Sequence, residues 1–258
     1  MVAVRHESVR SVFTGNMAWL CLTLLALIIS FGLSWLILMP LNFAFEWLYS
    51  LLGIDQHIAT FGPKNTLRLD FELTTDSERF RLFSEIASAI HHQGVGLEAL
   101  VYHNPQGTAL ATFLTHDEVV HLQDVAILID RMKVLLIVAT LLFIALLAWI
   151  YFRSSHMPSF RSMLLTALIF LGFCIAIVLL IGPHKVFYTL HVWVFPEEHK
   201  WFFYYEESLM STLMKAPDLF AYIAILLLAL AVPIFVLIMW IVQRVLRIKI
   251  SRNDESLA

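Results

Sequence analysis

The sequence predicts an α-helical polytopic membrane protein with four transmembrane helices and a small extracytoplasmic α/β subdomain. Of its 258 residues, 60% are hydrophobic and only 14% are charged, whereas soluble domains carry about 25% charged residues. A helix needs about 20 mostly apolar residues to cross a bilayer. Four stretches without Lys, Arg, Asp or Glu are long enough to cross a bilayer: 11–45, 134–152, 162–183 and 219–243. They exclude a soluble enzyme and a nucleic-acid-binding protein.

The distribution of charge predicts the orientation of the four spans. Only three of the twenty acidic residues lie in the two tails and in the short link between spans two and three. Because short basic segments stay in the cytoplasm, we expect both termini inside and both longer loops outside. The basic residues of these inner segments are Arg5, Arg10, Arg153, Arg161, Arg244, Arg247, Lys249 and Arg252.

The first apolar stretch and the two cysteines exclude further classes. That stretch far exceeds the apolar core of about 7–15 residues in a signal peptide, so it is predicted to be an anchor from about Met17 to Pro40. Cys21 and Cys174 both lie in apolar stretches. Without a cysteine in either outer loop, thiol-exchange chemistry outside is excluded.

Segment 53–115, between spans one and two, is predicted to be an extracytoplasmic α/β insertion. Thr66–Leu73 alternates polar and apolar residues, which is typical of a half-buried strand. A T-x-x-E capping box at Thr75–Glu78 then predicts a helix that ends near Gly94. The remainder predicts a hairpin, with strands Leu97–His103 and Thr108–Leu114 around a type I turn at Asn104–Gly107.

A second capping box, Thr115–Glu118, predicts a helix that runs through the second span to Phe152, about 55 Å at 1.5 Å per residue. Spans three and four are predicted at about 161–181 and 219–243. The second extracytoplasmic loop, 183–216, is too charged to span and is rich in aromatic residues, which favour the membrane–water interface. We expect this loop on the outer surface of the bilayer, and the whole chain, 1–258, to form a single membrane domain.

Nine of the eleven histidines lie on the predicted outer side, and His121 is distinguished among them. Glu118 lies three residues before it and Asp124 three after, so all three share a helix face and one carboxylate is expected to orient the imidazole as a base. Glu118 is equally explained as a cap and His121 as a surface residue, so both interpretations remain open. The others have ordinary interpretations: His91 and His92 end a helix, and His57, His103 and His199 are loop residues.

The E-x-x-H spacing of Glu118 and His121 also matches part of a di-iron site, which needs a second such motif and two further glutamates. Glu197, Glu198 and His199 have the wrong spacing and lie in a loop. The sequence contains no H-E-x-x-H, phosphate-binding glycine loop or G-x-S-x-G motif. We therefore expect neither a metal nor a cofactor.

Phe113–Val125 and motifs within Leu190–Pro217 resemble a family of bacterial integral membrane proteins that includes the lipoprotein intramolecular transacylase. The first, Phe113–Val125, is similar to the E-x-x-H-[LMF]-x-[DE]-V motif that precedes the family's second span. The chain departs from the family at Ala126, where a lysine is common, and at Leu190 and Val194, where aromatic residues are usual. The second motif is matched by Leu190–Pro196, Trp201–Phe203, Ser208–Leu209 and Pro217.

The resemblance implies an acyltransferase that moves an acyl chain from the glyceryl ester of a diacylated lipoprotein to the α-amine of its own N-terminal cysteine. It implies that His121 and His191 are catalytic, with Glu118 or Asp124 orienting His121, the expected base. The implied partners are diacylated lipoproteins and membrane lipids, with an outward-facing site in a bacterial plasma (inner) membrane. The aromatic residues expected to bind substrate are Trp193, Phe195, Trp201 and Phe203.

Two other classes remain as alternatives. A non-catalytic envelope binding or assembly protein predicts that replacing His121 and His191 together has no effect. A metal-dependent membrane oxidoreductase predicts stoichiometric bound metal. If instead the two histidines serve one reaction, their rings must lie within roughly 10 Å of each other.

Overall fold

The computed structural model describes the backbone of residues 2–153 and 158–255, and the side chains of 16–153 and 158–247. The chain forms two compact units: unit 1 comprises 1–35, 133–180 and 227–258, and unit 2 comprises 36–132 and 181–226. Part of the orientation prediction rests on side chains outside the described residues, those of Arg5, Arg10, Lys249 and Arg252.

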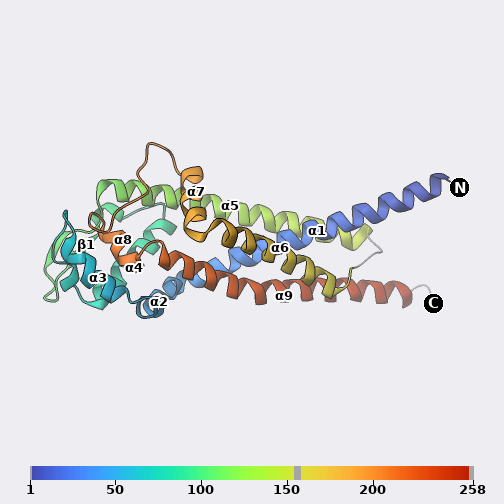
Figure 1. The fold of residues 1–258 in the computed structure, drawn as a ribbon. Helices are drawn as coiled ribbons and strands as arrows, with labels where there is room; N and C mark the ends of the chain where they lie inside the picture. The colour runs from blue at the N-terminus through green and yellow to red at the C-terminus, as the bar shows by residue number, and fades with distance from the viewer. Residues whose placement is uncertain (1, 154–157, 256–258) are drawn as a thin grey trace. The chain divides into compact units, whose positions relative to one another are not determined.

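Unit 1 is built from long apolar helices (Figure 1). Four helices of the structure are long and apolar enough to cross a membrane, which confirms the four predicted spans. Their core is mostly apolar, with Leu22, Phe143, Met163 and Met239 in one buried cluster. The contributing helices are α1 (Val2–Leu38), α5 (His116–Arg153), α6 (Phe160–Ile181) and α9 (Asp218–Glu255).

Unit 2 holds the polar segments between the spans, and it contains seven helices of one turn or more, several short 3-10 turns and one hairpin. After α1 the chain turns through η1 (Met39–Ala44), where Asn42, Phe43 and Ala44 have positive φ angles. The remaining elements are α2 (Phe45–Leu51), α3 (Ile54–Phe61), η2 (Gly62–Lys64), η3 (Phe71–Leu73), α4 (Asp76–His91), η4 (Leu97–Ala99), β1 (Val101–His103), β2 (Ala109–Thr112), the start of α5, α7 (Pro183–Val194), α8 (Leu209–Met214) and the start of α9.

Local sequence signals place the helix α4 and the hairpin as predicted. The Thr75 side chain accepts a hydrogen bond from the Glu78 N–H and so caps α4. The strands β1 and β2 pair antiparallel with Val101 opposite Thr112. The Gly107 N–H donates to the Asn104 carbonyl to close the turn. The helix and the hairpin are confirmed because each depends on contacts within a few residues. The first predicted strand, Leu97–His103, is too long, because Leu97–Ala99 forms η4 and only Val101–His103 is extended.

The predicted strand Thr66–Leu73 is wrong. Asp70 has a φ of 66°, which interrupts an extended chain, and Phe71–Leu73 forms the turn η3. Asn65 Oδ1 accepts from the Leu67 and Arg68 amides, so the backbone finds partners without a neighbouring strand. Only Phe71 of the four alternating apolar residues is buried; the exposed ones are Leu67, Leu69 and Leu73.

Segment 183–216 is not an irregular loop throughout, because it forms α7 and α8. Pro183 occupies the first turn of α7, a position where its missing N–H costs nothing. Ser208 caps α8 by accepting from the Ser211 N–H at 2.8 Å. The stretch between these two helices, residues 195–208, has no helix of its own and leaves α7 as a protruding arc (Figure 1).

Aromatic rings form part of the core of unit 2. Phe45 of α2 stacks on Phe83 of α4 with ring centroids 3.8 Å apart. Phe71, Tyr102 and Phe113 contact one another beside the hairpin. This core ties α2, α4, η3 and β1 to the residues that immediately precede α5.

Candidate active site

The first turn of α5 positions His121. Thr115 and Glu118 form a reciprocal capping box: the Glu118 N–H donates to Thr115 Oγ1 at 3.3 Å, and the Thr115 N–H donates to Glu118 Oε2 at 2.5 Å. This cap satisfies two amides that the helix leaves free. His121 follows one turn later, on a backbone that the cap holds in place.

The last turn of α7 positions His191. Its Nδ1 donates to the Phe187 carbonyl, one helical turn back, at 2.8 Å. Because a carbonyl only accepts, the neutral ring carries its proton on Nδ1, which leaves Nε2 with a free lone pair. His191 is therefore held in the tautomer in which Nε2 accepts a proton.

The two histidines meet although 70 residues separate them. Their ring centroids lie 6.2 Å apart with an interplanar angle of 32°, well within the separation predicted for a shared reaction. His121 is 8% exposed, and its Nδ1 is buried without a hydrogen-bond partner.

The surroundings of His121 and His191 favour the neutral form of each imidazole. Burial lowers the pKa of His191 below 6.5, and the hydrogen bond to the Phe187 carbonyl opposes this only in part. His121 is more deeply buried and also adjoins His191, and removal from water disfavours an imidazolium. The pair therefore offers proton acceptors and N–H donors near neutral pH.

Aromatic rings enclose the pair. The Phe195 ring lies 4.8 Å from His121 and 5.2 Å from His191, while Phe203 lies 6.0 Å from His121. Trp201 lies 5.1 Å from His191. Three of the four aromatic residues singled out in the sequence thus line the site, and the fourth, Trp193, is 78% exposed.

The carboxylates do not orient His121 as the sequence suggested. Glu118 Oε1 accepts from Ser208 Oγ at 2.5 Å, and Asp124 Oδ2 pairs with His199 Nδ1 at 2.6 Å. Both oxygens of Glu118 are thus engaged elsewhere, and His121 Nδ1 receives no hydrogen bond. The i±3 spacing places both carboxylates on the helix face of His121, but each carboxylate hydrogen-bonds to a residue that is distant in the sequence instead.

Other residues of the site gave little signal in the sequence. Ser208 and His199 lie 90 and 75 residues from their partners. Phe187, 4.0 Å from His191, was one of many aromatic residues in its segment. A helical i, i+4 pairing of Phe187 with His191 was the one local signal available, and it required knowing that 183–194 is helical.

Four further histidines have structural partners within unit 2. His91 and His92 donate to the Ala87 and Ser88 carbonyls at the end of α4, as expected. His57 and His103 are not loop residues, since they lie in α3 and β1. His57 packs against Tyr205 with centroids 4.5 Å apart, and His103 pairs with Glu78. Burial lowers the pKa of His57 to about 4.

Among the residues whose side chains are described, no three or more His, Cys, Asp or Glu groups are arranged to hold a metal ion. What the fold and the site define is a four-span helical membrane protein in which two histidines lie together within an aromatic enclosure.

This fold is similar to that of a solved enzyme. The structure matches the in meso structure of the membrane-integral lipoprotein intramolecular transacylase Lit from Bacillus cereus, in a histidine-to-arginine variant, with a TM-score of 0.64. The match covers 98% of this chain and 99% of that one at 12% sequence identity. No family model and no curated protein sequence matches the chain.

Proposed function

We propose that this protein is a membrane intramolecular transacylase that moves an acyl chain from the glyceryl ester of a diacylated lipoprotein to the α-amine of the same N-terminal cysteine. The observation that carries the proposal is the pair of His121 and His191, with centroids 6.2 Å apart inside an aromatic enclosure. The family resemblance of the sequence and the similarity of the fold to Lit support the same reaction.

The geometry of His191 favours it as the general base. Its Nε2 lone pair accepts a proton from the free α-amine as the nitrogen attacks the ester carbonyl carbon. His121 donates an N–H to the carbonyl oxygen, on which negative charge develops. The sequence alone suggested the reverse assignment, with His121 as base, but only His191 has its tautomer set by a hydrogen bond.

The reaction balances without a co-reactant. A C–N bond forms, the ester C–O bond breaks, and the proton that left the amine returns from His191 to the glyceryl oxygen. Since an ester becomes an amide, no energy donor is required. Phe195, Phe203 and Trp201 place apolar surface beside the two histidine rings, and apolar surroundings favour transfer to the amine over hydrolysis.

Mass spectrometry of one abundant lipoprotein, with and without this protein, tests the proposal. The transacylated N-terminal lipopeptide keeps the mass of the diacylated form, and its α-amine becomes blocked. A deacylase would remove one acyl chain, an intermolecular N-acyltransferase would add one, and a binding protein would change neither mass nor amine. Any of these three results contradicts the proposal.

Substitution identifies the residues. His191→Ala and His121→Ala are each expected to slow the shift by about 10² to 10⁴-fold, the usual contribution of a general acid or base. His92→Ala is the matched control, because this exposed histidine donates only to a carbonyl of its own helix. Full conversion by the His121 and His191 variants would remove the histidines from the mechanism.

We also propose that the site faces outward from a bacterial inner membrane and that both termini are cytoplasmic. The basic residues of the tails and of the link between spans two and three support this orientation. A reporter active only outside the cytoplasm is expected to work after Gly107 or Lys200. It is expected to fail after Ser155, which lies outside the described residues, and activity there would contradict the orientation.

A further inference from the structure

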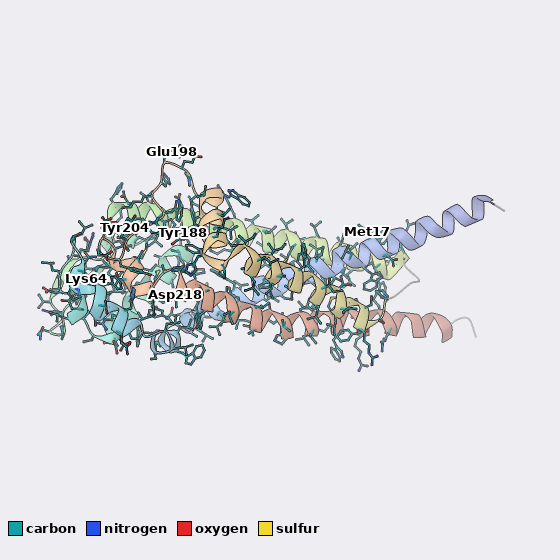
Figure 2. All side chains as sticks on the ribbon, in the orientation of Figure 1. Met17, Lys64, Tyr188, Glu198, Tyr204 and Asp218 are labelled. Carbon is teal, nitrogen blue, oxygen red and sulfur yellow. The ribbon has the colours of Figure 1, made fainter. Side chains whose placement is uncertain are left out.

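Segment 196–207, between α7 and α8, is fastened to α5 on both sides of His121. Ser208, at one end, hydrogen-bonds to Glu118, three residues before His121. His199, near the other end, pairs with Asp124, three residues after it. Phe203 lies between the two attachments and contacts the His121 ring. Figure 2 shows Glu198 at the outermost point of the segment.

The two attachments differ in their access to water. Ser208 and Glu118 are both fully buried, so water cannot replace either partner. The His199 side chain is 39% exposed and that of Asp124 is 14% exposed. Because water competes with an exposed hydrogen bond, the attachment at His199 is the weaker of the two.

Phe203 is linked to the weaker attachment through Lys200. Lys200, next to His199, lies over the Phe203 ring with its Nζ 5.3 Å from the centroid, and it pairs with Glu207 at 3.6 Å. These contacts link the His199 end of the segment to the ring that covers His121. Displacement of His199 from Asp124 therefore moves Phe203 as well.

In the closed arrangement His121 has little access to any ligand. It is 8% exposed, and its Nδ1 is buried without a partner. A histidine that acts on an ester must contact it, so some covering group has to move. Phe203 belongs to a segment without helix or strand and with one solvent-accessible attachment, which makes it the part of the enclosure that opens at least cost.

We propose that His199 is a positioning residue of the histidine site: through its hydrogen bond to Asp124 it holds segment 196–207 closed over His121, and release of this bond admits the substrate ester. The proposal rests on the proposed function for the identity of that substrate. His199 itself touches neither His121 nor His191 in any contact of the described structure, so its action runs through Phe203.

Accessibility of position 203 tests the closure without any assay of activity. Phe203→Cys is placed in a chain whose two natural cysteines are replaced, Cys21→Ser and Cys174→Ser, and its reaction with a polar thiol reagent is timed in membranes. Adding His199→Ala is expected to accelerate labelling about tenfold, as loss of one hydrogen bond to a charged group allows. His92→Ala, the matched control, is expected to leave the rate unchanged.

Two conservative variants identify the atom responsible. In His199→Asn the side-chain amide nitrogen lies near the place of Nδ1 and can donate to Asp124, so labelling is expected to stay within about twofold of the parent. In His199→Gln the nitrogen lies near the place of Nε2, and labelling is expected to match His199→Ala. Glu198→Cys, on the exposed tip, serves as a reference that reacts rapidly in every background.

Equal labelling of position 203 in the parent and in all three His199 variants would overturn the proposal, and so would equal acceleration in the Asn and Gln variants. In the transacylation assay, His199→Ala is expected to lower kcat about tenfold with less change in KM, and His199→Asn to restore it. If labelling follows the expected order but the parent protein transfers no acyl chain, the positioning role stands and the proposed function fails.

Discussion

The two T-x-x-E capping boxes of this protein share the hydrogen bond to the threonine but differ in what the glutamate carboxylate binds. In each, the glutamate N–H donates to the threonine hydroxyl at 3.3 Å. In α4 the Glu78 carboxylate pairs with Arg81 and His103. In α5 the Glu118 carboxylate is fully buried and accepts from Thr115 and from Ser208. One motif thus supports a structural helix, and the other fastens a distant segment beside the candidate active site.

In both boxes the threonine specifies the helix start, but the glutamate carboxylate differs: both Glu78 oxygens accept from Arg81, whereas one Glu118 oxygen accepts from the Thr115 N–H of its own cap. Glu78 faces β1, where the His103 N–H and the Arg81 guanidinium are available. Glu118 forms no ion pair among the described side chains, although Arg68 lies near enough to interact electrostatically. What the carboxylate binds decides whether the glutamate serves only its own helix or also holds together distant parts of the fold.

The largest expected effect comes from removing each carboxylate. Glu118→Ala leaves two buried donors, Thr115 N–H and Ser208 Oγ–H, without an acceptor, which costs about 3 kcal/mol of the free energy of unfolding. It also releases the segment over His121, and activity is expected to fall about 100-fold. Glu78→Ala is expected to leave activity within about twofold. Thermal unfolding in detergent and the lipopeptide assay measure both, and equal activity losses would contradict the distinction between the boxes.

Removing the partner hydroxyl tests the buried attachment itself. Ser208→Ala deprives Glu118 of a donor and α8 of its cap, with an expected cost of about 2 kcal/mol. Combined with Glu118→Ala, the two losses are expected to fall short of their sum by about 1 kcal/mol, because both remove the same hydrogen bond. Strict additivity in a double-mutant cycle would show that the two side chains do not interact.

The pH dependence of unfolding tests the ion pairs of Glu78 in α4. Burial raises the pKa of Glu78, but the hydrogen bonds from Arg81 and His103 outweigh it and bring the pKa down from 4.5 to about 2. Since the folded pKa is depressed, this stabilisation is fully present above pH 4.5 and is lost as pH falls toward 2. Comparing the pH dependence of unfolding in the parent and in Glu78→Gln is expected to show a shallower acid slope for the variant. Parallel slopes would refute the assignment.

The smallest effect on stability is expected from removing the threonine hydroxyl, which the two capping boxes have in common. Thr75→Ala and Thr115→Ala each remove one N-cap acceptor, and each is expected to cost about 1 kcal/mol. Equal losses of unfolding free energy would show that both threonines serve as helix caps. A decline in activity only for Thr115→Ala would show that the α5 cap also supports the candidate active site. A much larger cost at Thr115 would mean that its cap also carries the long-range attachment.

The sequence predicted those parts of the molecule that depend on composition or on near neighbours. The four spans follow from long uncharged stretches, and the caps of α4 and α5 follow from residues three apart. The predicted strand at Thr66–Leu73 is wrong because the alternation of polar and apolar residues indicates one apolar face, but a strand also needs a neighbouring strand to pair with. Instead, the Arg68 guanidinium bonds to the Thr112 and Leu114 carbonyls, and the chain turns at Asp70.

For the candidate site, the sequence named the two histidines but not their supports. His121 and His191 stand out because each belongs to a recognisable motif. The pairings of Glu118 with Ser208 and of Asp124 with His199 join residues 90 and 75 positions apart. Local spacing carries no information on such pairs, so the carboxylates were assigned to the nearest histidine instead.

Which nitrogen of His191 carries the proton depends on whether the last turn of α7 is helical. Nδ1 is protonated because the Phe187 carbonyl lies one turn back in α7. That helix has twelve residues, none of them buried, and Gly182 gives it no side-chain cap; a helix so short is marginal in water. Unwinding this one turn would free the ring to exchange tautomers. A detergent that loosens α7 would thus inactivate the protein while its long helices, and nearly all of its circular dichroism, stayed intact.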